Sequence, residues 1–208
     1  FVFGRGLLTA NLLDAGACVD TDGDGRPDVQ YNLAPFAPGA PGHPPLDFHA
    51  VQIHPMTMRP NSRGRLGLAS RDPLQPPKFV SDALREEADM DTLRRGVRLA
   101  QDIFAQPALR DLVGEEIWPG PDVSTAVGSN RFDDAIRAQA RTIYHPAGTC
   151  RMGATDASVV DTRLRVHGVT GLRVADCSVM PALVSGNTNA PTMMIADRAT
   201  DWIVSEHG

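Results

Sequence analysis

Alternating apolar and polar residues predict β-strands in the first third of the chain. The pattern runs through Asp28–Leu33 and Phe48–Met58, and Gly64–Ser70 continues it. Pro55 in the second run indicates an edge strand or a bulge. Because polar or proline-rich links join the three runs, we expect one antiparallel sheet with a face open to solvent. Residues 1–19 show no clear period and predict no element.

Apolar residues at helical spacing predict three helices farther along. The first spans Asp89–Ala105 with Asp89 or Asp91 as its N-cap, and the second spans Arg131–Ile143. The third spans about Pro191–Ser205, where a proline suits the first turn. The apolar residues expected on the buried side of this last helix are Met193, Met194, Ile195, Ala199, Trp202 and Ile203. Strands followed by helices make the predicted fold class α+β.

Composition narrows the classes of partner. The 208 residues carry a formal net charge of −5 without a basic run, which disfavours nucleic acid and anionic membrane surfaces. No apolar stretch approaches the ~20 residues that span a bilayer, and the first ten residues lack the pattern of a signal peptide. Cys18, Cys150 and Cys177 are too scattered for a disulfide framework. Because the chain starts at Phe1 inside an apolar segment, we expect it to be a piece of a longer protein.

An acidic turn is a candidate metal site. Asp20, Asp22 and Asp24 alternate with small or polar residues before a glycine, and Asp28 adds an oxygen at the ninth position. This matches the first half of a calcium loop, although Tyr31 stands at the twelfth position, where a bidentate Glu is usual. Two interpretations stay open: a solvated acidic hairpin, and a structural Ca²⁺ that fixes the turn before the first predicted strand.

His145 is a candidate general base. It is followed by a proline and a Gly-Thr turn, so its imidazole stands on a stiff, non-helical support. Histidine also has an unperturbed pKa near neutrality, which suits proton transfer at physiological pH. The pattern is equally compatible with a histidine that is simply hydrogen-bonded in a loop.

A polar turn, Ser185–Thr192, opens the last predicted helix. With Asn189 as its cap, several backbone N–H groups converge there with the positive end of the helix dipole. Such a turn can stabilise an anion, and the Asn187 amide can both donate and accept hydrogen bonds. An ordinary helix start with an Asn/Pro sequence is the alternative interpretation.

Three ordered segments resemble the carboxy-terminal signature of the glucose-methanol-choline (GMC) flavoprotein oxidoreductases. They are YHPAGTCRMG at 144–153, VVDTRLRVHGVTGLRVADCSVMP at 159–181 and SGNTNAPTMMIADRATDWI at 185–203. Weaker similarity upstream extends the resemblance over nearly the whole chain. It is strongest to the choline and long-chain alcohol dehydrogenase branch.

The resemblance implies FAD as the cofactor and oxidation of an alcohol to an aldehyde or ketone, with hydride transfer to flavin N5. It makes His145 the catalytic base and Asn187 the second active-site group. The residues that it assigns to FAD are Ala175, Asp176, Asn189, Ala190, Pro191 and Thr192.

The resemblance also implies a division of the chain. Residues 1–143 are expected to be mainly a substrate-binding domain, an antiparallel sheet with helices. Residues 144–208 are expected to hold the catalytic loop and the closing segment of a Rossmann-like FAD-binding domain. That domain opens with a GxGxxG turn, which this sequence lacks. We therefore expect an amino-terminal companion chain, either from a nicked precursor or as a separate subunit.

Two other functions remain as alternatives at this point. One is a non-catalytic, calcium-stabilised binding or structural module that descends from the same fold. The other is a GMC-type hydroxynitrile lyase, which keeps FAD but performs no net redox reaction.

Overall fold

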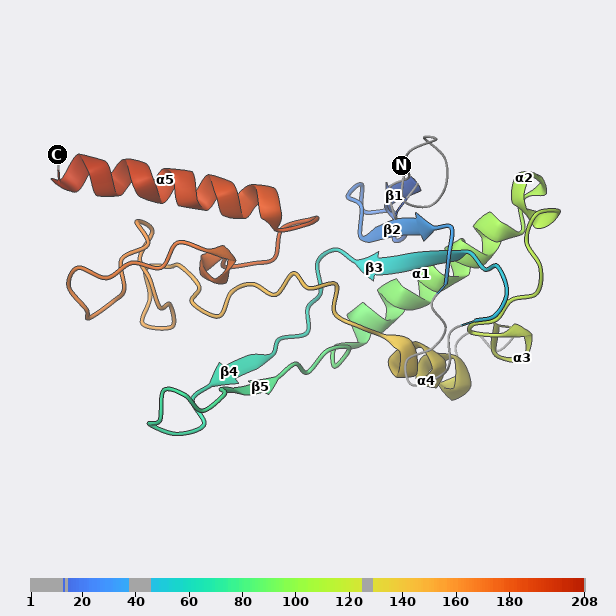
Figure 1. The fold of residues 1–208 in the computed structure, drawn as a ribbon, viewed down its shortest axis with the longest axis horizontal. Helices are drawn as coiled ribbons and strands as arrows, with labels where there is room; N and C mark the ends of the chain where they lie inside the picture. Colours follow the sequence, from blue (N-terminus) through green and yellow to red (C-terminus); the bar gives the residue numbers. More distant parts are fainter. Residues whose placement is uncertain (1–12, 14, 38–45, 125–128, 208) are drawn as a thin grey trace. The chain divides into compact units, whose positions relative to one another are not determined.

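The structure, a computed structural model, describes residues 13, 15–37, 46–124 and 129–207 (Figure 1). The chain forms two compact units, each described here by itself. We call residues 1–61 with 84–141 the sheet unit, and residues 62–83 with 142–208 the loop unit. The predicted α+β class is confirmed, because antiparallel sheets and helices both occur. No described helix has the length and hydropathy that crossing a membrane requires.

A three-stranded antiparallel sheet begins the sheet unit. Its strands are β1 (Ala15–Val19), β2 (Val29–Ala34) and β3 (Gln52–Thr57), in the order β1-β2-β3. The strands predicted at Asp28–Leu33 and Phe48–Met58 are confirmed as β2 and β3. β1 consists of small, mostly exposed residues. Its sequence therefore lacks the alternation of apolar and polar residues that would have predicted a strand.

The third predicted strand belongs elsewhere, so the expectation of a single sheet that includes Gly64–Ser70 is wrong. β4 (Arg65–Gly67) pairs with β5 (Lys78–Val80) in a separate antiparallel hairpin of the loop unit. Alternation indicates an extended conformation but does not specify which strand will be the partner. The backbone at Gly64 lies close to the backbone at Val80, since a Cβ on Gly64 would be 2.5 Å from the Val80 carbonyl oxygen.

The described part of the sheet unit also contains four helices: α1 (Glu87–Phe104), α2 (Pro107–Arg110), α3 (Pro121–Ser124) and α4 (Asn130–Gln139). The predicted N-caps of α1 are wrong, because Glu86 occupies the cap position. Asp89 is instead a buried residue of the first helical turn. Its carboxylate accepts a hydrogen bond of 2.7 Å from the backbone N–H of Asn61. α4 ends four residues before the predicted Ile143, because Ala140 leaves the helical conformation.

One face of α1 forms the core of the sheet unit. Met90 and Val97 pack with Phe132 and Ile136 of α4, all at most 4% exposed. Farther along, α1 lies against β2 and β3 (Figure 1). The approach is close at Gly96, whose carbonyl accepts a hydrogen bond of 2.9 Å from the Tyr31 hydroxyl.

Replacing Gly96 with alanine is expected to weaken this packing. The new Cβ would lie 3.0 Å from Pro55 Cβ and 3.4 Å from Val29 Cγ1, so these side chains or α1 must shift by a few tenths of an ångström. Overpacking costs about 1–3 kcal/mol, which outweighs the ~1 kcal/mol that alanine gains in helix propensity. Hydrogen exchange of the α1 amides should therefore accelerate. Gly114→Ala, where a Cβ meets nothing within 4 Å, is the control, and equal protection in both variants would contradict the prediction.

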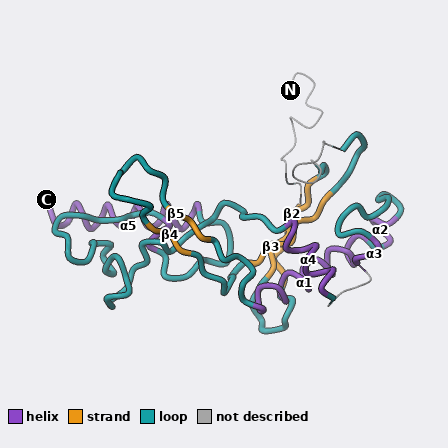
Figure 2. The backbone as a smooth tube through the Cα atoms, turned by 90° about the horizontal axis from the view of Figure 1, so that it is seen from below, coloured by secondary structure: helices purple, strands orange, loops and turns teal. Residues whose placement is uncertain are grey.

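Loops make up most of the loop unit (Figure 2). Its regular elements are the β4–β5 hairpin, the 3-10 helix η2 (Cys177–Val179) and α5 (Asn189–His207). Isolated β-bridges pair Met152 with Val160 and Val160 with Val166, and so connect the loops. The buried core residues of this unit are Val160, Leu164, Val179, Met180, Ile195 and Ala199.

The predicted last helix is confirmed as α5. Only some of the residues that were expected on its buried side are in fact buried. Ile195 and Ala199 are buried. Met193, Met194 and Ile203 are 64%, 59% and 43% exposed, so assigning them to the core of this chain is wrong. The helix is apolar on more than one side, and the rest of the described loop unit covers only the side that carries the two buried residues.

Candidate functional site

His145 lies at the start of a loop that is fastened to η2. The amides of Cys150 and Met152 donate to the carbonyls of Ser178 and Val179 at 2.9 and 2.8 Å. Gly148 turns the loop with a φ of +84°, a conformation that glycine adopts without strain. The histidine therefore precedes a segment that backbone hydrogen bonds fasten to η2.

A side-chain contact joins this loop to the polar turn before α5. His145 Nδ1 lies 2.9 Å from Thr188 Oγ1, and the Thr188 amide points at the same nitrogen from 3.5 Å. Thr188 is 7% exposed, and the preceding residue is the exposed Asn187. The structure thus brings the two predicted catalytic positions to one place, although they are 42 residues apart in sequence.

The start of α5 presents exposed backbone. The helix begins at Asn189 itself, two residues before the predicted start, so the assignment of Asn189 as the cap is wrong. Asn189 and Ala190 are exposed, and N–H groups at this position in a helix have no acceptor within it. Pro191 has no N–H, and the Thr192 amide and hydroxyl both donate to the Thr188 carbonyl, at 3.0 and 2.6 Å. This start is suited to a polar or anionic group.

Ala175 and Asp176 precede η2 and are both exposed. The Asp176 carboxylate caps η2 by accepting a hydrogen bond of 2.7 Å from the Ser178 amide. Asp176 therefore fixes the same segment on which the His145 loop is fastened.

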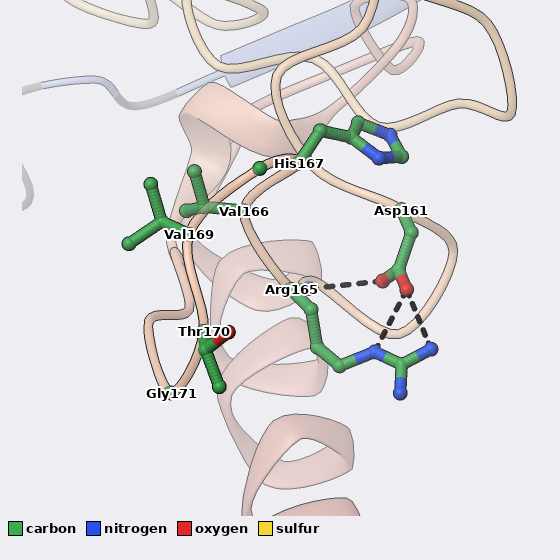
Figure 3. Close-up of a pocket in the computed structure, with 8 residues that line it drawn as sticks. Asp161, Arg165, Val166, His167, Val169, Thr170 and Gly171 are labelled. Carbon is green, nitrogen blue, oxygen red and sulfur yellow. Dashed lines mark hydrogen bonds and ion pairs between the residues drawn. The ribbon is translucent and has the colours of Figure 1, made fainter.

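A surface depression in the loop unit is separate from these residues (Figure 3). Its lining residues are Asp161, Arg165, Val166, His167, Gly168, Val169, Thr170 and Gly171. Arg165 donates to both carboxylate oxygens of Asp161, through its amide at 2.9 Å and its Nε at 2.8 Å. Burial alone would raise the pKa of Asp161, but these hydrogen bonds, the Arg163 amide and the Arg165 charge together outweigh burial and lower the pKa. Asp161 and Arg165 are paired with each other, and the depression includes neither His145 nor Asn187.

The acidic turn of the sheet unit brings together three of its four predicted ligands. Carboxylate oxygens of Asp20, Asp22 and Asp24 lie within 4.8 Å of one another. The fourth, Asp28, is buried and accepts hydrogen bonds from Thr21 and from Arg95 instead. Burial acts to raise the pKa of Asp28, but these hydrogen bonds and the Arg95 charge hold it below its usual range. The Asp20 carboxylate accepts from the amides of two glycines at 2.7 Å.

Calcium binding at this turn stays a prediction. If the site is real, titration with Ca²⁺ should give a saturable heat of binding and raise the thermal midpoint of the protein. Asp20→Asn should abolish both effects, because it removes one of the grouped carboxylates. Asp72→Asn is the control, since Asp72 is an exposed aspartate in another turn. Titration without heat and without a change in midpoint would leave a solvated hairpin as the explanation.

Comparison with known proteins identifies the family. The model of the GMC oxidoreductase family matches residues 60–196, which include His145 and the whole polar turn Ser185–Thr192. The chain belongs to the GMC oxidoreductases. The oxygen-dependent choline dehydrogenase of Burkholderia pseudomallei is 41% identical over 201 residues, 96% of this chain and 35% of that protein. The Chromohalobacter salexigens choline dehydrogenase is 39% identical over 204 residues, 97% of this chain and 36% of that protein. This GMC chain therefore spans about a third of the length of these relatives.

Solved structures place the GMC chain in the same fold. Pyridoxine 4-oxidase from Mesorbium loti matches with a TM-score of 0.82 at 26% identity, over 92% of this chain and 38% of that one. A variant of the Aspergillus oryzae formate oxidase, studied for modification of its FAD, matches with a TM-score of 0.81 at 27% identity, over 88% and 32%. A fungal aryl-alcohol oxidase matches with a TM-score of 0.69 at 28% identity, over 89% and 29%.

Thr188 has no role predicted from the sequence. It lies inside the polar turn, between Asn187, the predicted second active-site group, and Asn189, a predicted FAD contact. Only the tertiary approach of the turn to His145 shows that its hydroxyl meets the imidazole. A hydroxyl residue next to a predicted active-site residue was the available signal.

Proposed function

We propose that this chain is the catalytic side of a flavin-dependent alcohol oxidoreductase. Its substrate would be an alcohol, and its product the aldehyde or ketone. The observation that carries the proposal is the contact between the His145 ring and Thr188, which follows Asn187 in sequence and precedes the exposed start of α5. Membership of the GMC family supports flavin chemistry at this place.

The donors at the start of α5 fit part of a flavin. A helix start with exposed N–H groups favours negative charge, and a reduced flavin carries such charge on its pyrimidine ring. Of the proposed FAD residues, Asn189, Ala190, Pro191 and Thr192 form this start, and Ala175 with Asp176 lies before η2 in the same unit. When bound, FAD would accept the hydride at N5.

The residues of this chain would handle the substrate oxygen and its proton. His145 would take the hydroxyl proton as the α-hydrogen departs, and the contact with Thr188 keeps its ring in one orientation. The Asn187 amide would donate to the same oxygen and hold it in place. The His145 imidazole and the Asn187 amide must both act on the substrate oxygen. The contact of His145 with the turn that carries Asn187 supports assigning them as a pair.

A companion polypeptide belongs to this proposal. The chain spans about a third of its choline dehydrogenase relatives and lacks a GxGxxG turn for the pyrophosphate. We propose that a companion carrying the amino-terminal part of the FAD domain completes the cofactor site. In that arrangement, residues 144–208 close the FAD domain, and residues 1–143 mainly bind substrate.

The visible absorption spectrum of the native, undissociated assembly tests the cofactor. Oxidised flavin bands at a stoichiometry of one per chain are expected, and no amino acid of this chain produces them. Gel electrophoresis of the same sample should show the companion polypeptide. A verified native assembly without flavin would contradict the oxidoreductase proposal and favour a non-catalytic module.

A further inference from the structure

Thr188 is held more firmly than a residue of an ordinary loop. It is 7% exposed, and its carbonyl accepts hydrogen bonds from both the amide and the hydroxyl of Thr192. The first turn of α5 therefore fixes its backbone. From this anchored position its hydroxyl reaches His145 Nδ1 at 2.9 Å, while its amide is 3.5 Å from the same atom.

We propose that Thr188 is a positioning residue for His145, an inference that rests on the proposed function. When Nε2 is the nitrogen that takes the proton, Nδ1 keeps its hydrogen throughout, and the Thr188 hydroxyl oxygen accepts that hydrogen in both states of the ring. The Thr188 amide only donates, so it cannot bond to Nδ1 while that nitrogen carries its hydrogen. The Thr188 hydroxyl is thus the group that holds the ring through a full cycle of proton transfer.

The consequence concerns the other ring nitrogen. Because Nδ1 is occupied by Thr188, Nε2 is the nitrogen that remains for the substrate oxygen. A general base acts only when it lies within hydrogen-bond reach of its proton, so a rotated ring loses much of its effect. Thr188 would influence the rate of reaction without touching the substrate.

Three variants separate this role from a general structural one. Thr188→Val keeps the shape of the side chain and removes the hydroxyl, while Thr188→Ser keeps the hydroxyl. Thr200→Val is the matched control, because Thr200 lies on α5 and its hydroxyl bonds only to the helix, at Ala196 O. If Thr188→Val does not retain FAD, Thr188→Ala takes its place.

The kinetic test uses the FAD-containing assembly under anaerobic conditions. With Thr188→Val, the limiting rate of flavin reduction should fall by about 10- to 100-fold, the range for a misplaced catalytic group, with little change in substrate dissociation constant. Thr188→Ser should recover most of the rate, and Thr200→Val should match the unmodified protein. A normal rate with Thr188→Val, or no recovery with serine, would overturn the inference.

Crystal structures of the unmodified and Thr188→Val assemblies give a readout that does not depend on activity. The imidazole should face residue 188 in one orientation in the first and adopt a different or mixed orientation in the second. An unchanged ring in the variant would overturn the positioning role. If the unmodified assembly holds FAD but no alcohol reduces it, the proposed function fails, and the ring orientation still decides the role of Thr188.

Discussion

Replacing His145 with alanine is expected to lower the rate of flavin reduction by an alcohol at least ~100-fold, within the usual span for a general base. In the proposed mechanism the His145 imidazole takes the hydroxyl proton, and alanine leaves only water for that task. Its Nδ1 lies 2.9 Å from the Thr188 hydroxyl oxygen, so one side of the ring already has a hydrogen-bond partner. Anaerobic stopped-flow measurement of flavin reduction in the assembly gives the rate directly.

The matched control is His167→Ala. His167 belongs to the same unit, but it lines the surface depression of Figure 3, and its Nε2 lies 3.1 Å from the Gly153 carbonyl oxygen. Its loss should leave flavin reduction close to normal. A near-normal rate with His145→Ala, in a sample with full FAD content, would refute the assignment of His145 as the base.

Met180→Ala is expected to have the largest effect on stability, a loss of about 2–5 kcal/mol for a buried methionine. Met180 is 4% exposed and belongs to the core that joins the η2 segment to α5. Truncation leaves a cavity beneath the segment to which the His145 loop is bonded. Native-state hydrogen exchange should show this as easier opening at the amides of Met152 and Val179, which are hydrogen-bonded within this region.

Met180→Leu separates loss of volume from loss of methionine. It nearly conserves volume, so the expected cost is below about 1.5 kcal/mol. Comparable exchange in the leucine and alanine variants would show that this core does not support the His145 loop as described.

The sequence predicted the regular elements where burial leaves a clear period. β2 alternates buried Val29 and Tyr31 with half-buried neighbours, and α1 places Met90 and Val97 on one face. His145 and Asn187 were predicted from a stiff loop and a polar turn, together with the family resemblance. The structure adds that these two segments meet.

The remaining features depend on tertiary contacts that local patterns do not encode. Gly64–Ser70 pairs with β5 rather than with the first sheet, because pairing is decided by the path of the chain. Asp89 was predicted as a helix N-cap, but its carboxylate accepts a hydrogen bond from the backbone N–H of Asn61. Met193 and Met194 fit an apolar helix face, yet this chain leaves them exposed. The role of Thr188 required the approach of two segments that are distant in sequence.

The most direct test of the account is anaerobic titration of the FAD-containing assembly with alcohols, beginning with choline because the relatives at about 40% identity are choline dehydrogenases. Loss of the oxidised flavin bands, together with formation of the aldehyde, is the expected result for at least one alcohol. The same titration of the His145→Ala assembly should proceed far more slowly. A flavin that stays oxidised with every primary and secondary alcohol tested would contradict the account and indicate a reaction without net redox, as in a hydroxynitrile lyase.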